Sequence, residues 1–547
     1  MAKYPNLPLT EELHRQVAAE PWPDNLGTFL ADAALRLGDR QAFTFFEEDA
    51  NVPLATLSYR QLDKAVSRFA AALAALGLKR GEHVGIMLAN TPAWPVTWLA
   101  IARLGAVMVP INVRYTAREL AYVLDDSDTK WLIVGAAYAH LLPELGEARP
   151  DPARTILVGA ENPAPCRDWL AVYEAGDGAT RPARGPALDD LVTIQYTSGT
   201  TGFPKGVMLS HRHWFSFARL GTMETRHLGI GRVFLAHPFY YMAGQAVFLF
   251  ALHLDASLSI APQLSIRRFM PWVRATRANY TLVTNAILKQ NLAPEDRKNA
   301  LKYLHVSAAY VPEMQDAIED QFGCPVRNIY GMTENGIATY VPLRATGKLG
   351  PDCIGIAAPL REVAIMDEGG QPLPDGEIGE ICVRGPGILK GYYKKPEANR
   401  DNFFGDWHRS GDRACRDADG FFHFLGRMKD VIRRSNENIS ALEIETVLLS
   451  LKGVERAAAV GVPDEMRGEE VKIYLVLNPG MDKKDLPPEA ILAHCERNLA
   501  PFKLPRYIEY RAEVPTTPSD KIEKAKLRAE KPDLRVGAWD REAKIWR

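Results

Sequence analysis

The region from Ser58 to Val134 alternates helix-like and strand-like patterns, and this rhythm constrains the fold more than any other feature of the sequence. Runs with apolar residues three and four apart predict amphipathic helices, and short apolar runs between them predict buried strands. Such βαβ units form parallel sheets covered by helices, so we expect an α/β fold. The expected helices are Tyr59–Leu76 and Trp94–Leu104, and the expected strands are His83–Leu88, Ala106–Ile111 and Lys130–Val134.

The rest of the chain divides into regions with different patterns. A second helix-and-strand series runs through residues 257–330, and short strands with Gly/Pro turns follow after about Gly350. A new α+β pattern begins near Asp430. We therefore expect a large N-terminal domain, residues 1–429, with two α/β subdomains and a β-rich subdomain. A small α+β C-terminal domain, residues 430–547, is expected to follow it.

The same patterns give further local expectations. Residues 159–190 are rich in Ala, Pro, Gly and Asp, which is typical of a surface linker. The expected strands beyond this linker are Leu191–Gln195, Tyr280–Val283, Tyr303–Val306, Val326–Ile329, Val363–Met366, Gly379–Arg384, Phe421–Leu425, Val454–Val462 and Val471–Leu477. The expected C-terminal helices are Ala441–Leu451 and Pro488–Asn498.

Composition and charge exclude several classes of protein. The 547 residues include 66 basic and 67 acidic side chains, so no overall field attracts nucleic acid or an anionic membrane. The six cysteines are scattered without metal-ligand spacing, which argues against a disulfide framework or a zinc site. The N-terminus lacks the apolar core of a signal peptide, and no apolar run reaches the roughly 20 residues of a membrane span. We expect a cytoplasmic protein without integral membrane association.

The segment Tyr196–Gly206 concentrates hydroxyls, glycines and one lysine after an expected strand. Glycines let backbone N–H groups approach a polyphosphate, hydroxyls add donors, and Lys205 supplies positive charge near the β- and γ-phosphates. The spacing differs from the Walker A pattern, so a P-loop NTPase is excluded. A flexible Gly/Ser/Thr turn is the alternative interpretation of this composition.

The segment closely resembles the phosphate loop of the adenylate-forming superfamily, which comprises acyl-CoA synthetases, luciferases and peptide-synthetase adenylation domains. The resemblance extends over nearly the whole chain, because Tyr330-Gly331-Met332-Thr333-Glu334 is similar to the next motif of that family. It implies that Tyr330 stacks on adenine, Thr333 meets the α-phosphate, and Glu334 helps to hold Mg²⁺. It also implies metal binding at Thr197 and catalytic roles for Thr197, Glu334 and Lys521.

Later motifs of the family complete the nucleotide site. The blocks Gly379–Pro386 and Gly391–Tyr393 resemble a family segment that we interpret as scaffold, because glycine-flanked alternating residues mainly form hairpins. The resemblance makes Asp412 the acceptor for both ribose hydroxyls and Asp430 the interdomain hinge. The implied ATP- and AMP-binding residues are Thr197, Ser198, Gly199, Thr200, Thr201, Lys205, Ala309, Tyr330, Thr333, Asp412 and Arg427.

The C-terminal region resembles the mobile domain of the family but departs from it at two glycines. Ser435, Asn436 and Glu437 correspond to the coenzyme A channel, with Asn436 in place of the usual glycine. Near the end, Lys521 corresponds to the lysine that stabilises charge during adenylation, and Asp520 replaces the common glycine before it. Asn tolerates left-handed backbone angles better than most residues, so the turn at Asn436 is expected to survive. Asp also tolerates such angles, and Asp520 is expected to lower the mobility of its loop or to pair with Lys521.

The acyl pocket is expected around His237–Gln245, which aligns with a block that often contains a histidine where Tyr241 stands. Amino-acid-activating relatives commonly carry an aspartate at this place for the substrate ammonium. Its absence disfavours amino-acid activation by roughly 2 to 4 kcal/mol if the site is buried. The implied pocket residues do not distinguish aryl, medium-chain, hydroxylated and dicarboxylic acids. They are Tyr240, Tyr241, Gly244, Asn285, Ala308, Met332 and Ile337.

The resemblance implies a carboxylic acid:CoA ligase that uses ATP, Mg²⁺ and coenzyme A. The acid attacks the α-phosphorus to form acyl-AMP and pyrophosphate, and the C-terminal domain then rotates so that a thiol takes the acyl group. One alternative is an acyl-AMP ligase that loads the phosphopantetheine of a carrier protein. Another is a non-catalytic binder on the same fold, against which the retained set Lys205, Glu334, Asp412, Arg427 and Lys521 argues. A homodimer is left open.

Overall fold

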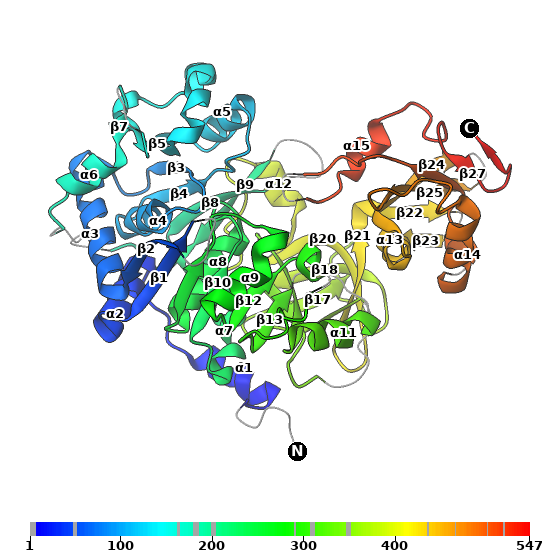
Figure 1. Ribbon diagram of the computed structural model, residues 1–547, viewed down its shortest axis with the longest axis horizontal. Helices are drawn as coiled ribbons and strands as arrows, with labels where there is room; N and C mark the ends of the chain where they lie inside the picture. The colour runs from blue at the N-terminus through cyan, green and yellow to red at the C-terminus, as the bar shows by residue number, and fades with distance from the viewer. Residues whose placement is uncertain are drawn as a thin grey trace. The chain divides into compact units, whose positions relative to one another are not determined.

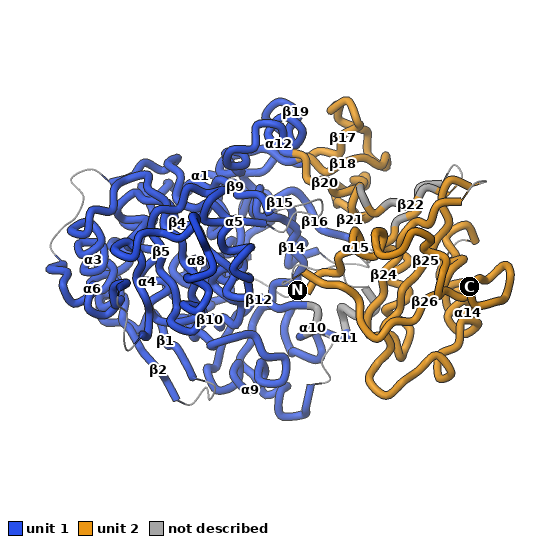
Figure 2. Tube along the Cα trace, turned by 90° about the horizontal axis from the view of Figure 1, so that it is seen from above, with its two compact units in different colours: residues 1–197, 204–363, 383–408 blue, residues 198–203, 364–382, 409–547 orange. Residues whose placement is uncertain are grey.

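The computed structural model describes residues 7–47, 52–160, 165–178, 185–197, 204–288, 292–306, 312–345, 352–434, 437–464, 467–499, 501–517 and 520–547. The chain forms two compact units, shown in different colours in Figure 2. The first unit comprises residues 1–197, 204–363 and 383–408, and the second comprises residues 198–203, 364–382 and 409–547. Each unit is internally packed around cores of its own. The α/β fold expected from the sequence is confirmed.

The first unit contains two mainly parallel sheets (Figure 1). One has the strand order β7-β6-β5-β3-β4-β8-β9, and the other has the order β16-β15-β14-β13-β12-β10-β11-β1-β2 within this unit. Their strands are β1 (Gln41–Phe46), β2 (Pro53–Ser58), β3 (His83–Met87), β4 (Val107–Pro110), β5 (Thr129–Gly135), β6 (Thr155–Val158), β7 (Arg167–Asp168), β8 (Leu191–Thr197), β9 (Lys205–Ser210), β10 (Arg232–Leu235), β11 (Ser257–Ile260), β12 (Tyr280–Val283), β13 (Tyr303–Val306), β14 (Val326–Met332), β15 (Gly336–Tyr340) and β16 (Cys353–Ala357).

Helices cover both sheets, and their positions follow the sequence periodicity. The helix α3 begins as expected at Tyr59, because the Ser58 side chain accepts a hydrogen bond from the Gln61 N–H and the Gln61 side chain accepts one from the Ser58 N–H. The helices of this unit are α1 (Thr10–Ala19), α2 (Leu26–Leu37), α3 (Tyr59–Ala75), α4 (Ala93–Arg103), α5 (Ala117–Asp126), α6 (Trp169–Ala175), α7 (His211–Thr222), α8 (Met242–His253), α9 (Ile266–Thr276), α10 (Asn285–Leu288), α11 (Pro312–Phe322) and α12 (Pro396–Asp401).

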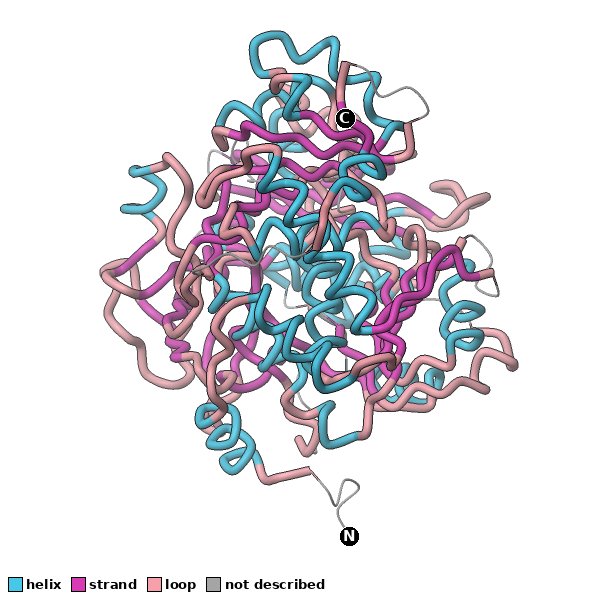
Figure 3. The backbone as a smooth tube through the Cα atoms, turned by 90° about the vertical axis from the view of Figure 1, so that its left-hand side faces the viewer, coloured by secondary structure: helices cyan, strands magenta, loops and turns pink. Residues whose placement is uncertain are grey.

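Alternating side chains on the strands of both sheets enter different cores. Ile86 of β3 joins the large core that α4, α7 and α8 share, whereas its neighbour Met87 joins a separate core against α5. On β10, Val233 likewise enters the shared core and Phe234 enters a third core against α9. Figure 3 shows a group of helices with strands on either side of it. Successive strand residues point to opposite faces, so this pattern places helices on both faces of each sheet.

Aromatic side chains fill the shared core between the sheets. The ring centroid of Trp98 lies 5.5 Å from that of Trp214 and 5.7 Å from that of Phe248, which joins α4, α7 and α8. All three rings are fully buried. Such edge-to-face and tilted contacts suit the ring quadrupoles and add to the free energy gained from area burial.

The expectation of a surface linker at residues 159–190 is wrong for part of that range. Trp169, Val172 and Tyr173 lie on one face of α6, at helical spacing, and pack on the first unit. The Trp169 indole donates a hydrogen bond to Thr97 over 3.1 Å. Abundant Pro, Gly and Asp on both sides concealed this short helix, whose apolar face is visible in the spacing of its three large side chains.

The second unit combines β-hairpins with an α+β sheet in the order β23-β22-β25-β26-β27-β28. It includes, wholly or in part, β17 (Glu362–Met366), β18 (Gly379–Arg384), β20 (Trp407–Arg416), β21 (Phe422–Arg427), β22 (Val431–Arg434), β23 (Glu437–Ser440), α13 (Ala441–Ser450), β24 (Val454–Asp464), β25 (Gly468–Leu477), α14 (Pro488–Asn498), β26 (Tyr507–Tyr510), α15 (Lys524–Ala529), β27 (Trp539–Asp540) and β28 (Ile545–Trp546). The domain boundary at residue 429/430 stays a prediction.

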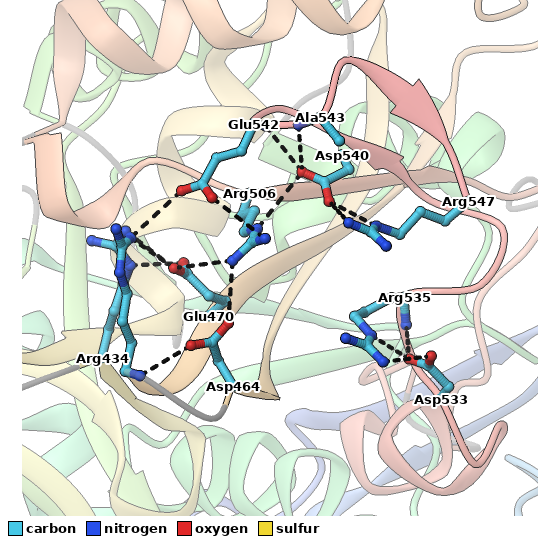
Figure 4. A network of polar contacts seen from close by, with 11 residues as sticks. Arg434, Asp464, Glu470, Arg506, Asp533, Arg535, Asp540, Glu542, Ala543 and Arg547 are labelled. Carbon is cyan, nitrogen blue, oxygen red and sulfur yellow. Dashed lines mark hydrogen bonds and ion pairs between the residues drawn. The ribbon is translucent and has the colours of Figure 1, made fainter.

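A buried carboxylate ties several strands of the second unit together (Figure 4). Glu470 of β25 is fully buried and pairs with Arg434 at 2.7 Å and with Arg467 at 2.8 Å. Arg506 lies 3.8 Å from Glu470 and 3.6 Å from Asp540 of β27. Burial raises the pKa of Glu470, and the guanidinium groups oppose that rise. Arg434 ends β22 and Glu470 lies in β25, so their ion pair holds the end of β22 against β25. Removal of one partner would leave an uncompensated buried charge.

Candidate active site

The two strands that flank the phosphate loop are firmly held. Thr197, at the end of β8, pairs with Lys205, at the start of β9, in an antiparallel ladder. The Tyr196 hydroxyl donates to Asp126 over 2.8 Å, and the Tyr122 hydroxyl donates to the Pro204 carbonyl over 3.0 Å. The ends of the loop are therefore fixed on α5. The loop residues Ser198, Gly199, Thr200 and Thr201 lie outside the described residues.

The structure brings both Lys205 and Glu334 to the side chain of Tyr392. The Lys205 ammonium lies 5.3 Å from the centroid of the Tyr392 ring, and the Tyr392 hydroxyl donates to Glu334 Oε1 over 3.1 Å. These two residues are 129 positions apart in the chain, and the sequence predicted both for the nucleotide site independently. A cation and a carboxylate that contact the same side chain can face a polyphosphate and its counterion together.

A tight hairpin between β14 and β15 carries Tyr330, Met332, Thr333 and Glu334. Gly331 is required in this hairpin, because a Cβ atom there would lie 1.8 Å from the Gly336 carbonyl oxygen. Tyr330, Met332 and Thr333 are partly exposed, as contact with a ligand requires. The expected pocket residue Ile337, in contrast, is buried in the large core of the first unit.

Two tyrosines and an asparagine meet at the predicted acyl pocket. The ring centroids of Tyr240 and Tyr241 lie 4.7 Å apart, and the Asn112 amide donates to the Tyr241 hydroxyl oxygen over 3.1 Å. Burial is the main cause that raises the pKa of Tyr241 to about 12, so the phenol stays protonated at neutral pH. Because the Asn112 amide donates a hydrogen bond to the phenol oxygen, the O–H group of Tyr241 can itself donate to another acceptor. The sequence analysis did not single out Asn112.

Of the remaining predicted pocket residues, the structure describes the surroundings of Gly244 only. Gly244 lies against the backbone, since a Cβ atom there would be 2.3 Å from the Pro238 carbonyl oxygen. Any larger residue at this position would clash with the turn before α8, which explains why a glycine stands here. Asn285 begins α10, and its side chain is outside the described part of the chain, as are Ala308 and Ala309.

In the second unit, Asp412 and Arg427 face each other across the β20–β21 ladder. Arg427 Nε lies 2.8 Å from Asp412 Oδ1, and the Asp412 side chain is 3% exposed whereas that of Arg427 is 45% exposed. The Asp412 backbone N–H also donates to the Ser410 hydroxyl over 3.0 Å. Asp412 is thus an oriented carboxylate with a cationic neighbour, which suits an acceptor of ribose hydroxyls.

The predicted hinge residue Asp430 pairs with two cations of α15. Arg528 Nη2 lies 2.9 Å from Asp430 Oδ1, and Lys524 Nζ lies 3.6 Å from Asp430 Oδ2. Lys524 also lies 2.7 Å from Glu445. Burial raises the pKa of Glu445, whereas Lys524 lowers it. The helix that follows the predicted adenylation lysine is therefore attached to the predicted hinge.

The turn that carries Lys521 is closed by local hydrogen bonds. The Thr517 N–H donates to the Lys521 carbonyl over 2.7 Å, and Thr516 forms a bridge with Ile522. Asp520 has φ = 63°, so the left-handed turn expected there is confirmed. The Asp520 carboxylate also pairs with Arg456 at 2.8 Å. These contacts hold the backbone of Lys521 against that of Thr517.

The predicted coenzyme A channel is described only in part. Glu437 pairs with Arg434 in the β22–β23 ladder, but its side chain is outside the described part. Ser435 and Asn436, which connect these strands, also lie outside the described residues.

Among the described residues, no group of three or more His, Cys, Asp or Glu side chains could hold a metal ion. The roles of Glu334 and Thr197 as Mg²⁺ ligands stay predictions. Among the same residues, no helix is long and apolar enough to cross a bilayer.

Comparisons with known proteins agree with this geometry. The sequence matches the model for AMP-binding enzymes over residues 30–393 and the model for the AMP-binding enzyme C-terminal domain over residues 443–521. It is 32% identical over 524 residues to crotonobetaine/carnitine–CoA ligase of Salmonella paratyphi A, with 92% of this chain and 99% of the relative covered.

Solved structures share the fold over nearly the whole chain. An anthranilate CoA ligase in complex with anthranoyl-AMP superposes with a TM-score of 0.83 at 23% identity, and 94% of this chain and 98% of that chain are covered. ATP-bound MatB from Rhodopseudomonas palustris gives a TM-score of 0.81 at 25% identity, covering 92% and 99%. The resemblance read from the motifs is confirmed, and this chain belongs to the family of AMP-binding enzymes.

Proposed function

We infer that this chain joins a carboxylic acid to coenzyme A in two steps, through an enzyme-bound acyl-AMP. It is an ATP-dependent, AMP-forming acid–thiol ligase. At the site, this function is supported mainly by the contacts that Lys205 and Glu334 both make with Tyr392. A chain that merely binds acids or nucleotides has no need for a phosphate cation and a metal carboxylate held together.

In the first step, the substrate carboxylate attacks the α-phosphorus of ATP and pyrophosphate leaves. Lys205 faces the β- and γ-phosphates, Tyr330 stacks on adenine, and Asp412 accepts the ribose hydroxyls. Lys521 stabilises the negative charge that develops between the carboxylate and the α-phosphate. Positioning and electrostatics account for this chemistry, since no side chain needs to move a proton.

Mg²⁺ is the counterion that this site is built to accept, with Glu334 and the Thr197 hydroxyl as its protein ligands. When bound there, the ion would supply positive charge to offset that of the departing pyrophosphate. Glu334 is suited to this task, because a tyrosine hydroxyl orients its carboxylate within a tight hairpin.

In the second step, the thiol of coenzyme A attacks the acyl carbon and AMP leaves. The C-terminal domain, residues 430–547, rotates about Asp430 between the steps and brings the segment Ser435–Asn436–Glu437 to the thiol channel. Lys521 leaves the nucleotide site during this rotation, so the two half-reactions use different faces of one mobile domain.

We propose that the substrate acid carries a polar substituent that accepts a hydrogen bond. Tyr241 is the donor, because burial keeps its phenol protonated and Asn112 occupies its oxygen. The ligase relatives act on acids as different as carnitine and anthranilate, so the pocket rather than the fold selects the substrate.

A panel of carboxylic acids tests this function directly. Aryl, hydroxylated, dicarboxylic, medium-chain and quaternary-ammonium acids are incubated with MgATP, with and without coenzyme A, and pyrophosphate release and products are followed by mass spectrometry. We expect acyl-AMP without coenzyme A and acyl-CoA with it. Acyl-AMP that transfers to a phosphopantetheinyl carrier protein but not to coenzyme A would replace this function by carrier loading. The absence of pyrophosphate release with every acid would refute it.

Glu334→Gln is expected to raise the KM for MgATP and the Mg²⁺ requirement while binding of the acid is retained. The substitution keeps the shape of the side chain and its acceptor for Tyr392 but removes the charge that faces the metal. Steady-state kinetics at varied Mg²⁺, compared with direct binding of the acid, measures the effect. An unchanged Mg²⁺ dependence would show that Glu334 has another role.

A further inference from the structure

Tyr392 occupies a special position between two elements of the nucleotide site. Its side chain is 5% exposed, its hydroxyl meets Glu334, and its ring lies beneath the Lys205 ammonium. We propose that Tyr392 is a positioning residue for the metal and phosphate site, with its hydroxyl orienting Glu334 and its ring orienting Lys205. This inference rests on the proposed function, since it gives Tyr392 a task in binding MgATP.

The backbone around Tyr392 is fixed to the second strand of the phosphate loop. Tyr392 forms an antiparallel bridge with Val207 of β9, and the Met208 N–H donates to the Gly391 carbonyl over 2.9 Å. The Asn399 side chain accepts from the Tyr392 N–H over 2.7 Å and donates to the Tyr392 carbonyl over 3.1 Å. The backbone of Tyr392 is therefore held by β9 and by Asn399.

The same segment is also fixed to the hairpin that carries Glu334. The Leu389 N–H donates to the Glu334 carbonyl over 2.6 Å, so the backbone and the side chain of Glu334 both contact residues 389–392. Strand β9, Glu334 and Tyr392 are therefore connected by direct contacts within the first unit. A displacement of β9 would therefore change the position of Glu334.

The chemistry of these contacts favours ligand positioning. A carboxylate offers several lone-pair sites, so it can accept from a hydroxyl and still bind a cation. Partners of this kind fix the orientation of metal ligands, and their loss commonly reduces metal affinity or activity by about 10- to 100-fold. The ring adds an attraction for the ammonium of Lys205, whose long side chain has many other conformations. The glycine-rich motif alone suggested a scaffold role and gave no sign of these contacts.

The test compares the same substitution at two adjacent tyrosines. Tyr392→Phe removes the hydroxyl that meets Glu334 and keeps the ring. Tyr393→Phe is the matched control, because the Tyr393 hydroxyl donates to Asp128 over 2.7 Å and does not serve the proposed site. MgATP binding to the full-length protein is measured by calorimetry without any acid, so that no turnover occurs, and the melting temperature of each free variant is recorded.

We expect Tyr392→Phe to weaken MgATP binding by roughly 10- to 100-fold, with a raised Mg²⁺ requirement and unchanged binding of the acid. Tyr393→Phe is expected to bind MgATP like the wild type. In the Glu334→Gln background, Tyr392→Phe should have a much smaller further effect, because the negative charge that the Tyr392 hydroxyl orients is already absent. Tyr392→Leu, which also removes the ring, should lose a further factor of about 2 to 5.

Equal MgATP affinity of Tyr392→Phe and the wild type would overturn the proposal, as would fully additive effects of Tyr392→Phe and Glu334→Gln. A lower melting temperature of Tyr392→Phe with unchanged MgATP affinity would also overturn the proposal, because it would show that Tyr392 has a structural role alone. These outcomes are distinct from a failure of the proposed function, which would appear as absence of acyl-CoA in the wild-type enzyme whatever the affinity for MgATP.

Discussion

Lys521→Ala is expected to slow acyl-AMP formation by roughly 10²- to 10³-fold, which is the scale of losing one preorganised charge donor. Two hydrogen bonds between Thr517 and the backbone of Lys521 hold the main chain at this position. Thioester formation from supplied acyl-AMP should be retained, since in the proposed rotation the lysine leaves the nucleotide site before the thiol attacks. Both half-reactions are measured with the same acid.

Lys526→Ala is the matched control for this prediction. Lys526 lies in the same segment, its side chain is 65% exposed, and it pairs with Glu523 on the surface. Its loss should leave both half-reactions at wild-type rates, because exposed ion pairs contribute little. If Lys521→Ala leaves adenylation intact, or slows both steps equally, the assignment of Lys521 is wrong.

The second large effect is expected at the hinge, where Asp430→Pro should show the opposite pattern. Proline fixes φ near −65° and obstructs the backbone rotation that domain alternation requires, so adenylate should form while thioester formation stalls. Single-turnover measurements with and without coenzyme A separate the steps. Accumulation of acyl-AMP on the enzyme would be the direct sign of the block.

Asp430→Asn separates the rotation from the ion pairs. It removes the charge that faces Lys524 and Arg528 but leaves the backbone angles unrestricted. These pairs are partly exposed, so both half-reactions should continue at rates within about 5-fold of the wild type. Equal stalling of thioester formation in Asp430→Asn and Asp430→Pro would assign the defect to the ion pairs and contradict a hinge at Asp430.

The regular elements could be predicted from the sequence because their signals are local. The strand β12 and the helix α14 have the bounds that apolar periodicity predicts. Asp520 could also be predicted to adopt a left-handed angle, because that preference belongs to the residue itself. The family and its ligase activity followed from short motifs, and the comparisons confirm them.

The contacts that organise the site could not be predicted in this way. Tyr392 and Glu334 are 58 residues apart, and Asp430 and Arg528 are 98 residues apart, so their pairing appears only when the sheets are assembled. Asn112 was missed for the same reason, because a polar residue after a strand gives no sign of its partner Tyr241. The nucleotide and acyl roles of individual residues stay predictions until the variants are measured.

The ion pairs of Asp430 have a consequence for recombining this protein with its relatives. Asp430, Lys524 and Arg528 are distant in sequence but act as one set. A crossover between Asp430 and Lys524 takes the carboxylate from one parent and the cations from the other, so the three positions should show epistasis. Chimeras that exchange the chain from a point before Asp430 inherit the set complete, and they should tolerate foreign C-terminal sequences better than chimeras joined within residues 431–523.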